Sequence, residues 1–238
     1  MLQACLNGDR SREQHPAIPL SPKELAKEAR AAVAAGAGAL HIHPRDGKGA
    51  ESLFAEPLAA CLRAVRRAVP GVPIGIGTST HIPPAAPDRL PEIARWSELP
   101  DYASVNLSEP GWQEQMMALK ARGVDIEAGV WSPEDAERLL SFEQAGVCLR
   151  VLIEMINLEP EDAKQRYHET RTVLEQGGLN LPLLLHGEEA CAWEMVHLAG
   201  QERLDTRAGF EDMLTLPDGT PAPDTGAILR AARLLACP

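Results

Sequence analysis

The sequence predicts an α/β protein that folds as a single (β/α)8 barrel, a TIM barrel, over residues 1–238. A short apolar segment, a loop and an amphipathic helical segment follow one another about eight times along the chain. Most of these apolar segments are apolar on both faces, which is typical of parallel strands covered by helices. Because no linker rich in serine, glycine or proline divides the chain, we expect one domain. An open, doubly wound sheet is the structural alternative.

The expected strands are short, and polar residues follow most of them. In chain order they are Leu2–Leu6, Ala39–His43, Val72–Ile76, Tyr102–Asn106, Val124–Ala128, Val147–Ile153, Leu181–Leu185 and Arg203–Arg207. Eight such units in 238 residues make a slightly small barrel, since about 250 residues are typical.

Helix signals separate these strands. The segment Ser21-Pro22-Lys23-Glu24 is a capping box with proline at the first helical position, and Gly36 follows as a stop signal. Ser132 begins a second helix that we expect to end at Gly146. A third follows Pro57, where apolar residues recur at helical spacing. The remaining helices are expected at about 88–97, 112–121, 160–176, 188–198 and 224–235.

Composition and charge exclude several classes of protein. The formal net charge is −11, whereas nucleic-acid binding needs a surplus of lysine and arginine. The longest uncharged stretch, residues 68–87, is interrupted by prolines and cannot be a membrane helix. The N-terminus shows no signal-peptide pattern, so we expect a cytoplasmic protein. The five scattered cysteines, which include Cys237, are expected to be reduced and buried.

Polar residues gather where an active site would lie. In such barrels the chemistry sits at the carboxyl ends of the strands. The polar segments expected there are 7–10, 41–46, 75–81, 104–106, 186–187 and 206–212, with the single residues Glu127, Arg150 and Glu154. Titratable side chains therefore follow apolar segments all around the predicted barrel.

Two histidines in the second strand give the sharpest signal. His41 and His43 share one face of the strand, with Cα atoms roughly 6–7 Å apart, so both imidazoles can reach one ion. A catalytic zinc site needs three protein ligands and an open position. Glu211 after the last strand is the best-placed third ligand, because strand eight neighbours strand one in a closed barrel. The alternative is a pair of hydrogen-bonded polar residues at the barrel mouth.

Candidate substrate contacts follow the third and fourth strands. Glycines at 75 and 77 allow a ligand to approach the backbone, and Thr78 and Ser79 could hold a carboxylate. The alternative for these glycines is barrel packing. Asn106 either donates to a substrate carbonyl or caps the next helix.

Three segments together resemble the β-keto acid cleavage enzymes. They are Asn7-Gly8, His41-Ile42-His43-Pro44-Arg45-Asp46 and Arg207-Ala208-Gly209-Phe210-Glu211-Asp212. Their order and approximate spacing match over nearly the whole chain. The type member of that family is the 3-keto-5-aminohexanoate cleavage enzyme of lysine fermentation.

The resemblance implies a reaction and a set of residue roles. A divalent cation, usually zinc, would be held by His41, His43 and Glu211. Asp212 would remove a proton from the β-keto acid, supported by Arg207. The reaction implied takes a small β-keto acid and acetyl-CoA to acetoacetate and a new acyl-CoA, a retro-Claisen exchange that needs an electron sink and a carboxylate base. A homo-oligomer, tetramer or dimer, is also implied.

The chain departs from the family pattern at several positions. Arg10 stands where the aminohexanoate enzyme has an acidic residue, so we expect Arg10 to face a distal carboxylate or a polar neutral group. The family serine on strand three falls on Gly77. A carboxylate of strand five is replaced around Gly129, which leaves Glu127 as the candidate substrate contact there.

Shortened loops leave alternatives open. Residues 152–158 and 186–189 replace longer family loops where an acyl-CoA is expected. The alternative function keeps the metal but not CoA: a lyase, aldolase or hydrolase on a small oxo-acid, with Glu154 or His186 as an added acid–base group. A third hypothesis is a non-catalytic binder of small molecules, which would have no need of Asp212 as a base beside the metal.

Overall fold

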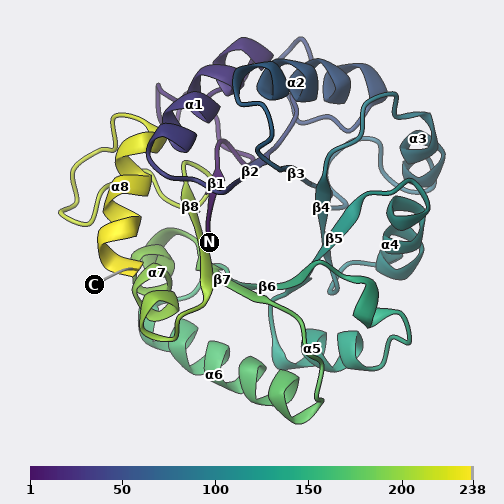
Figure 1. The fold of residues 1–238 in the computed structure, drawn as a ribbon, viewed down its shortest axis with the longest axis vertical. Coiled ribbons are helices and arrows are strands. Elements are labelled where there is room, and N and C mark those ends of the chain that lie inside the picture. Colours follow the sequence, from purple (N-terminus) through teal and green to yellow (C-terminus); the bar gives the residue numbers. More distant parts are fainter. Residues whose placement is uncertain (237–238) are drawn as a thin grey trace.

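Eight parallel strands close into a barrel in chain order, β1 to β8 (Figure 1). The structure, a computed structural model, describes residues 1–236. Closure is made by β1, which pairs in parallel with β2 on one side and with β8 on the other. This confirms the (β/α)8 barrel and excludes an open, doubly wound sheet.

Each expected strand overlaps an observed one. The strands are β1 Leu2–Cys5, β2 Ala39–Ile42, β3 Ile74–Gly77, β4 Tyr102–Asn106, β5 Asp125–Val130, β6 Arg150–Met155, β7 Leu183–Gly187 and β8 Asp205–Gly209. The helices that surround them are α1 Pro22–Ala34, α2 Ala55–Ala68, α3 Arg89–Arg95, α4 Trp112–Ala121, α5 Pro133–Leu140, α6 Pro160–Gln176, α7 Ala192–Gln201 and α8 Thr225–Ala236. Figure 1 shows them as a ring outside the barrel.

One helix is shorter than the sequence predicts. The helix that begins after Ser132 ends at Leu140 and not at Gly146. Its last turn tightens, because the amide of Phe142 donates to the carbonyl of Leu139, three residues back. The following residues form a separate 3-10 turn at Ala145–Val147. The capping box at Ser21 is present as expected, with both of its reciprocal hydrogen bonds.

The inside of the barrel is polar, which corrects the expectation of strands that are apolar on both faces. Residues that alternate toward the helices, such as Leu40 and Ile42, belong to the apolar core. Inside, Gln3 donates to Tyr102 Oη at 3.0 Å and to Glu127 Oε1 at 2.8 Å. The inward-pointing side chains therefore form a polar network held by hydrogen bonds and ion pairs.

Glu127 belongs to this interior network and not to the barrel mouth. Its carboxylate lies 2.9 Å from Arg150 Nε, and the residue is fully buried. Burial raises its pKa, and Arg150 offsets only part of that effect. Gln3 and Arg150 hold the side chain inside the barrel, outside the lining of the mouth cavity, so the substrate contact expected at Glu127 finds no support in this geometry.

Two other expectations concern membranes and cysteines. Among residues 1–236, no helix has the length and apolar composition needed to cross a membrane. Four cysteines are buried free thiols, Cys5, Cys61, Cys148 and Cys191. Cys237 lies outside the described residues.

Gly75 shows how a missing side chain makes room for the polar interior. A Cβ at this position would overlap the ring of Tyr102. That ring is itself fixed, because its hydroxyl donates to the carbonyl oxygen of Leu40 at 2.5 Å. Packing therefore explains this glycine.

Gly75→Ala should destabilise the fold by about 1–3 kcal/mol, the usual cost of forcing an extra carbon into a packed core. The measurement is urea unfolding followed by circular dichroism. Gly47→Ala is the matched control, because a Cβ there meets nothing within 4 Å and the free energy of unfolding should change by less than about 0.5 kcal/mol. Equal stability of the two variants would contradict the packing explanation.

Candidate metal centre and active site

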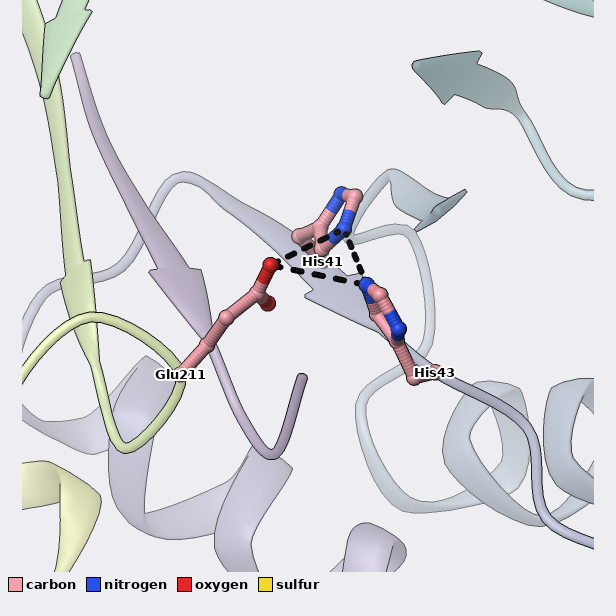
Figure 2. A group of neighbouring side chains, drawn as sticks. All are labelled: His41, His43 and Glu211. Carbon is pink, nitrogen blue, oxygen red and sulfur yellow. Dashed lines mark hydrogen bonds and ion pairs between the residues drawn. The ribbon is translucent and has the colours of Figure 1, made fainter. Parts of the chain in front are cut away.

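Two imidazoles and one carboxylate converge at the mouth of the barrel. His41 lies on β2, His43 directly follows it, and Glu211 comes from the segment after β8 (Figure 2). The two Nε2 atoms are 3.2 Å apart, and Glu211 Oε1 lies 3.4 Å from His43 Nε2 and 3.8 Å from His41 Nε2. Ligands of tetrahedral zinc, with bonds near 2.0–2.2 Å, are roughly 3.3–3.5 Å apart. The triangle thus has the size of a metal site.

The donor chemistry of this cluster fits a divalent cation. Glu211 Oε2 and His41 Nδ1 are buried without a hydrogen-bond partner. His43 Nδ1 lies 2.5 Å from Glu51 Oε1, which places a proton on that nitrogen, so a cation that displaces the Nε2 proton would meet a lone pair facing the cluster. Two imidazole nitrogens and one carboxylate form a donor set that zinc and similar cations accept.

Backbone contacts hold the ligands in place. The Asn7 amide donates to the carbonyl of His43 at 2.8 Å and accepts from the amide of His43 at 2.9 Å. Gly8 has φ +51°, and a Cβ there would overlap the side chain of Glu211. A Cβ at Gly77 would overlap the imidazole of His43. Gly77 therefore makes room for the imidazole of His43, a candidate metal ligand. The structure thus supports the packing alternative for this glycine.

The charges of the three groups are strongly coupled. Burial lowers the pKa of His41 well below its usual range. Burial also opposes charge on His43, but the carboxylates of Glu211 and Glu51 outweigh it and raise the pKa of His43 to about 10. Burial would raise the pKa of Glu211, yet Arg207 and the imidazoles hold it well below its usual range. Protons and a metal ion would therefore compete for this cluster, and metal affinity should fall in acid.

Arg207 and Asp212 form a buried pair beside the cluster. Arg207 Nη2 donates to Glu211 Oε1 at 2.9 Å and to Asp212 Oδ1 at 3.0 Å. Asp212 Oδ2 accepts from the Cys5 thiol at 2.7 Å, and His186 Nδ1 lies 3.5 Å from Oδ1. Asp212 is fully buried and lies outside the lining of the mouth cavity. Direct contact between Asp212 and a substrate is therefore not what the structure shows.

A cavity of about 360 Å³ opens above the ligand triangle. Arg10 lines it and is held by its own partners, donating to the carbonyl of Glu211 at 3.1 Å and pairing with Glu189 at 2.5 Å. The volume lies near the lower end of the roughly 300–1,000 Å³ usual for ligand sites, so it suits a small molecule.

The other expected substrate contacts differ in availability. Thr78, Ser79 and Asn106 all line the cavity. The Thr78 hydroxyl is already used, donating to the Ser104 carbonyl at 2.5 Å and accepting from a glutamine amide at 2.7 Å. Ser79 and Asn106 both donate to the carboxylate of Glu109. Thr78 is buried whereas Ser79 and Asn106 are partly exposed, so these two are the better candidates for ligand contacts.

Two acidic residues of the site were missed from the sequence. Glu51 lies beside His43 because the chain reverses over 46–49 and the backbone of Arg45 forms an antiparallel β-bridge with that of Glu51. The turn sequence Asp-Gly-Lys-Gly is the signal from which this reversal could have been predicted. Glu188 lies close enough to Glu211 and Asp212 to share an ion with them. Burial and the charge of Asp212 raise the pKa of Glu188 to about 7. Nothing local in the sequence distinguishes Glu188 from a surface glutamate.

The ligand triangle predicts metal binding that depends on its members. His43→Ala and Glu211→Ala should each lose a bound divalent cation, because two remaining ligands hold zinc far more weakly than three. The measurement is elemental analysis after dialysis against zinc and buffer. His168→Ala, an exposed histidine of α6, is the control and should keep wild-type metal content. Wild-type protein that retains no divalent cation would contradict the site.

Glu51 should strengthen metal binding through His43. Glu51→Gln keeps an acceptor for Nδ1 but removes the charge, and metal affinity should fall roughly 10–100-fold. Competition with a chelating dye measures this directly. Glu56→Gln, an exposed change on α2, should leave affinity unchanged. Wild-type affinity in Glu51→Gln would show that the carboxylate does not tune the imidazole.

Sequence comparisons connect the chain with known proteins. A family model described as beta-keto acid cleavage enzyme matches residues 1–237. The 3-keto-5-aminohexanoate cleavage enzyme of Fusobacterium nucleatum is 36% identical over 62 residues, 26% of this chain and 23% of that enzyme. The enzyme of the same name from Acetoanaerobium sticklandii is 28% identical over 83 residues, 35% of this chain and 30% of that enzyme. The chain therefore aligns with less than a third of either curated relative.

Solved structures agree on the fold. Apo ObcA has a TM-score of 0.70 at 17% identity, over 92% of this chain and 61% of that chain. A type I 3-dehydroquinate dehydratase from Clostridium difficile has a TM-score of 0.66 at 12% identity, over 99% of this chain and 92% of that chain. At such identities the likeness shows the barrel alone. The match over residues 1–237 shows more: the chain belongs to the beta-keto acid cleavage enzyme family.

Proposed function

We propose that the protein cleaves a small β-keto acid by acyl exchange with acetyl-CoA, forming acetoacetate and a new acyl-CoA. C2 of the keto acid loses a proton, bonds to the acetyl carbonyl and displaces the CoA thiolate. The thiolate then attacks the original ketone, and the bond between C2 and that carbon breaks. In this proposal the protein is a zinc-dependent acyltransferase. It acts in the cytoplasm as a homodimer or homotetramer.

The convergence of His41, His43 and Glu211 on one point carries this proposal. A divalent cation bound there, zinc or another, supplies Lewis-acid polarisation of a substrate carbonyl. Arg207 adds a fixed positive charge at the same edge of the cavity and is itself held by Glu211 and Asp212. A small organic anion is therefore the class of ligand that the cavity favours.

Arg10 supports a preference for substrates with a second acidic group. Its guanidinium lines the cavity and is almost fully buried, and its partner Glu189 is largely exposed. A carboxylate at the far end of the substrate could replace Glu189 on Arg10, whereas an ammonium would be repelled. Ser79 and Asn106 offer polar contacts in the same cavity.

CoA requires a site beyond this cavity. A cavity of about 360 Å³ accepts the thioester end of an acyl-CoA but not its nucleotide. ObcA, whose fold is similar, is described in a ternary complex with a C4-CoA adduct and oxalate and in a binary complex with oxaloacetate. These ligands support testing small keto acids with and without acetyl-CoA.

A second candidate function is a CoA-independent lyase, aldolase or hydrolase on a small oxo-acid. The observation in its favour is Glu154, a carboxylate that lines the cavity and lies 3.1 Å from the imidazole of His186. Such a pair can transfer a proton without a second substrate. Metal binding alone, with ligand affinity but no turnover, would instead identify a non-catalytic binder.

A panel of β-keto acids tests the proposal. Acetoacetate should form from a dicarboxylic β-keto acid when acetyl-CoA is present. The amino-substituted substrate 3-keto-5-aminohexanoate should react more slowly, because Arg10 repels its ammonium group. The measurement is acetoacetate and acyl-CoA by mass spectrometry, with and without acetyl-CoA. Product without acetyl-CoA would favour the second candidate function and contradict acyl exchange.

The same panel tests Arg10. Arg10→Glu should lower kcat/KM for dicarboxylic acids by roughly ten- to a hundredfold, because a charge-assisted hydrogen bond is lost. The same substitution should raise the rate with 3-keto-5-aminohexanoate relative to the rate with dicarboxylic acids. Arg67→Glu, an exposed change on α2, makes the same charge change away from the site and should alter neither rate. A wild-type protein that prefers the amino substrate would contradict the role of Arg10.

A further inference from the structure

The wall of the mouth cavity opposite the ligand triangle is built by β4, β5 and β6. Asn106 at the end of β4 and Glu154 on β6 both line the cavity. The strands follow chain order in a closed ring, so β6 is four strands from β2 in either direction (Figure 1). A substrate that the triangle holds by one face would therefore turn its other face toward these two residues.

Gly129 on β5 lets two side-chain oxygens approach the strand. A Cβ at this position would lie 2.7 Å from Asn106 Oδ1 and 2.7 Å from Glu154 Oε1. Gly129 is the register partner of Asn106, so the two residues lie side by side on neighbouring strands. Any larger residue at 129 would displace both oxygens, which therefore converge on one point of the cavity wall.

Hydrogen bonds identify the Asn106 atom at this point as an acceptor. Asn106 Nδ2 donates to Glu109 Oε1 at 3.1 Å. Because a carboxylate oxygen accepts hydrogen bonds and does not donate them, this contact fixes which end of the Asn106 amide is nitrogen and which is oxygen. Within residues 1–236, no group donates to Asn106 Oδ1. This oxygen is therefore free to accept a hydrogen bond from a ligand.

Glu154 presents the second acceptor. Its Oε1 accepts from Trp131 Nε1 at 3.2 Å, and its Oε2 lies 3.1 Å from His186 Nε2. These two contacts hold the side chain in place, and Glu154 is only 6% exposed. A carboxylate oxygen has two lone pairs, so Oε1 can accept a second hydrogen bond from a ligand.

His186 offsets the negative charge of Glu154. It is fully buried on β7 in register with Glu154, and its Nδ1 lies 3.5 Å from Asp212 Oδ1. Burial and Arg207 lower the pKa of His186, but Asp212 and Glu154 outweigh them and raise it. The imidazolium lies between two carboxylates, and Arg10 adds positive charge to the same cavity. A neutral hydrogen-bond donor therefore suits this wall better than an ammonium group.

We propose that Asn106 Oδ1 and Glu154 Oε1 form a subsite that accepts a hydrogen bond from a hydroxyl group of the substrate. The inference rests on the proposed function and names the substrate class more closely: a small β-keto acid with a hydroxyl on a carbon beyond the ketone. A methylene in its place would leave both oxygens facing an apolar group. No bond forms or breaks at this subsite, so Glu154 binds the substrate without taking a proton from it.

The probes are 3-ketohexanedioate and its 4-hydroxy, 5-hydroxy and 5-amino derivatives. Calorimetry on zinc-loaded protein without acetyl-CoA gives the dissociation constant of each acid, and kcat/KM is measured with acetyl-CoA. At least one hydroxy derivative should bind roughly 10–100-fold more tightly than the parent acid, because it gains a hydrogen bond to a charged acceptor. The 5-amino derivative should bind no more tightly than the parent acid.

Gly129→Ala removes the subsite without touching the ligand triangle. Its Cβ would push both oxygens aside, so the affinity ratio of hydroxy derivative to parent acid should fall close to one, with wild-type metal content. Glu154→Gln should lower this ratio part of the way, because a neutral acceptor is weaker than a charged one. Gly146→Ala is the matched control and should keep the wild-type ratio, since its Cβ meets no atom of residues 1–236 within 4 Å.

The outcomes separate the inference from the proposed function. Equal affinity of wild-type protein for the parent acid and both hydroxy derivatives would overturn the inference and leave the proposed function intact. Gly129→Ala that loses affinity for every acid by the same factor would overturn it too, because a structural role does not distinguish a hydroxyl. Tightest binding of the 5-amino derivative would show a cation site instead. Wild-type protein that binds none of the acids and forms no acetoacetate would overturn both.

Discussion

The structure depends on one electrostatic constraint: the carboxylate of Glu211 is held among buried groups and needs positive charge beside it. Arg207 supplies part of that charge through a 2.9 Å contact, and His43 supplies more at 3.4 Å. Uncompensated burial of a carboxylate costs several kcal/mol. The cation that the cluster would bind solves the same problem, because it replaces the proton shared with His43. The same arrangement would therefore serve both the folded site and a bound cation.

This constraint explains why the inside of the barrel is polar. A buried arginine such as Arg207 needs acceptors, and it finds them on Glu211 and Asp212. Below the mouth, Arg150 and Glu127 form an ion pair, and Gln3 donates a hydrogen bond to Glu127. Glycines replace side chains where these large polar groups need space, as Gly75 does for Tyr102. The apolar core is displaced to the layer between strands and helices.

Chain periodicity was sufficient to predict the fold and the ligand triangle. Alternation along a strand places His41 and His43 on one face, and closure of the barrel brings β8 near β2, so Glu211 could be inferred without coordinates. The depth of Glu127 could not be predicted, because strand order does not tell how deep a residue lies along the barrel axis. Its register opposite Arg150 puts it below the mouth.

The partners of the ligands were beyond the reach of such patterns. Glu51 reaches His43 through an irregular turn, and Glu154 reaches His186 through the pairing of two strands whose register the sequence does not state. Asp212 follows Glu211 directly, yet the two side chains separate: Glu211 faces the cavity, whereas Asp212 turns inward to Cys5. Adjacent residues of one motif thus acquire different access to a substrate.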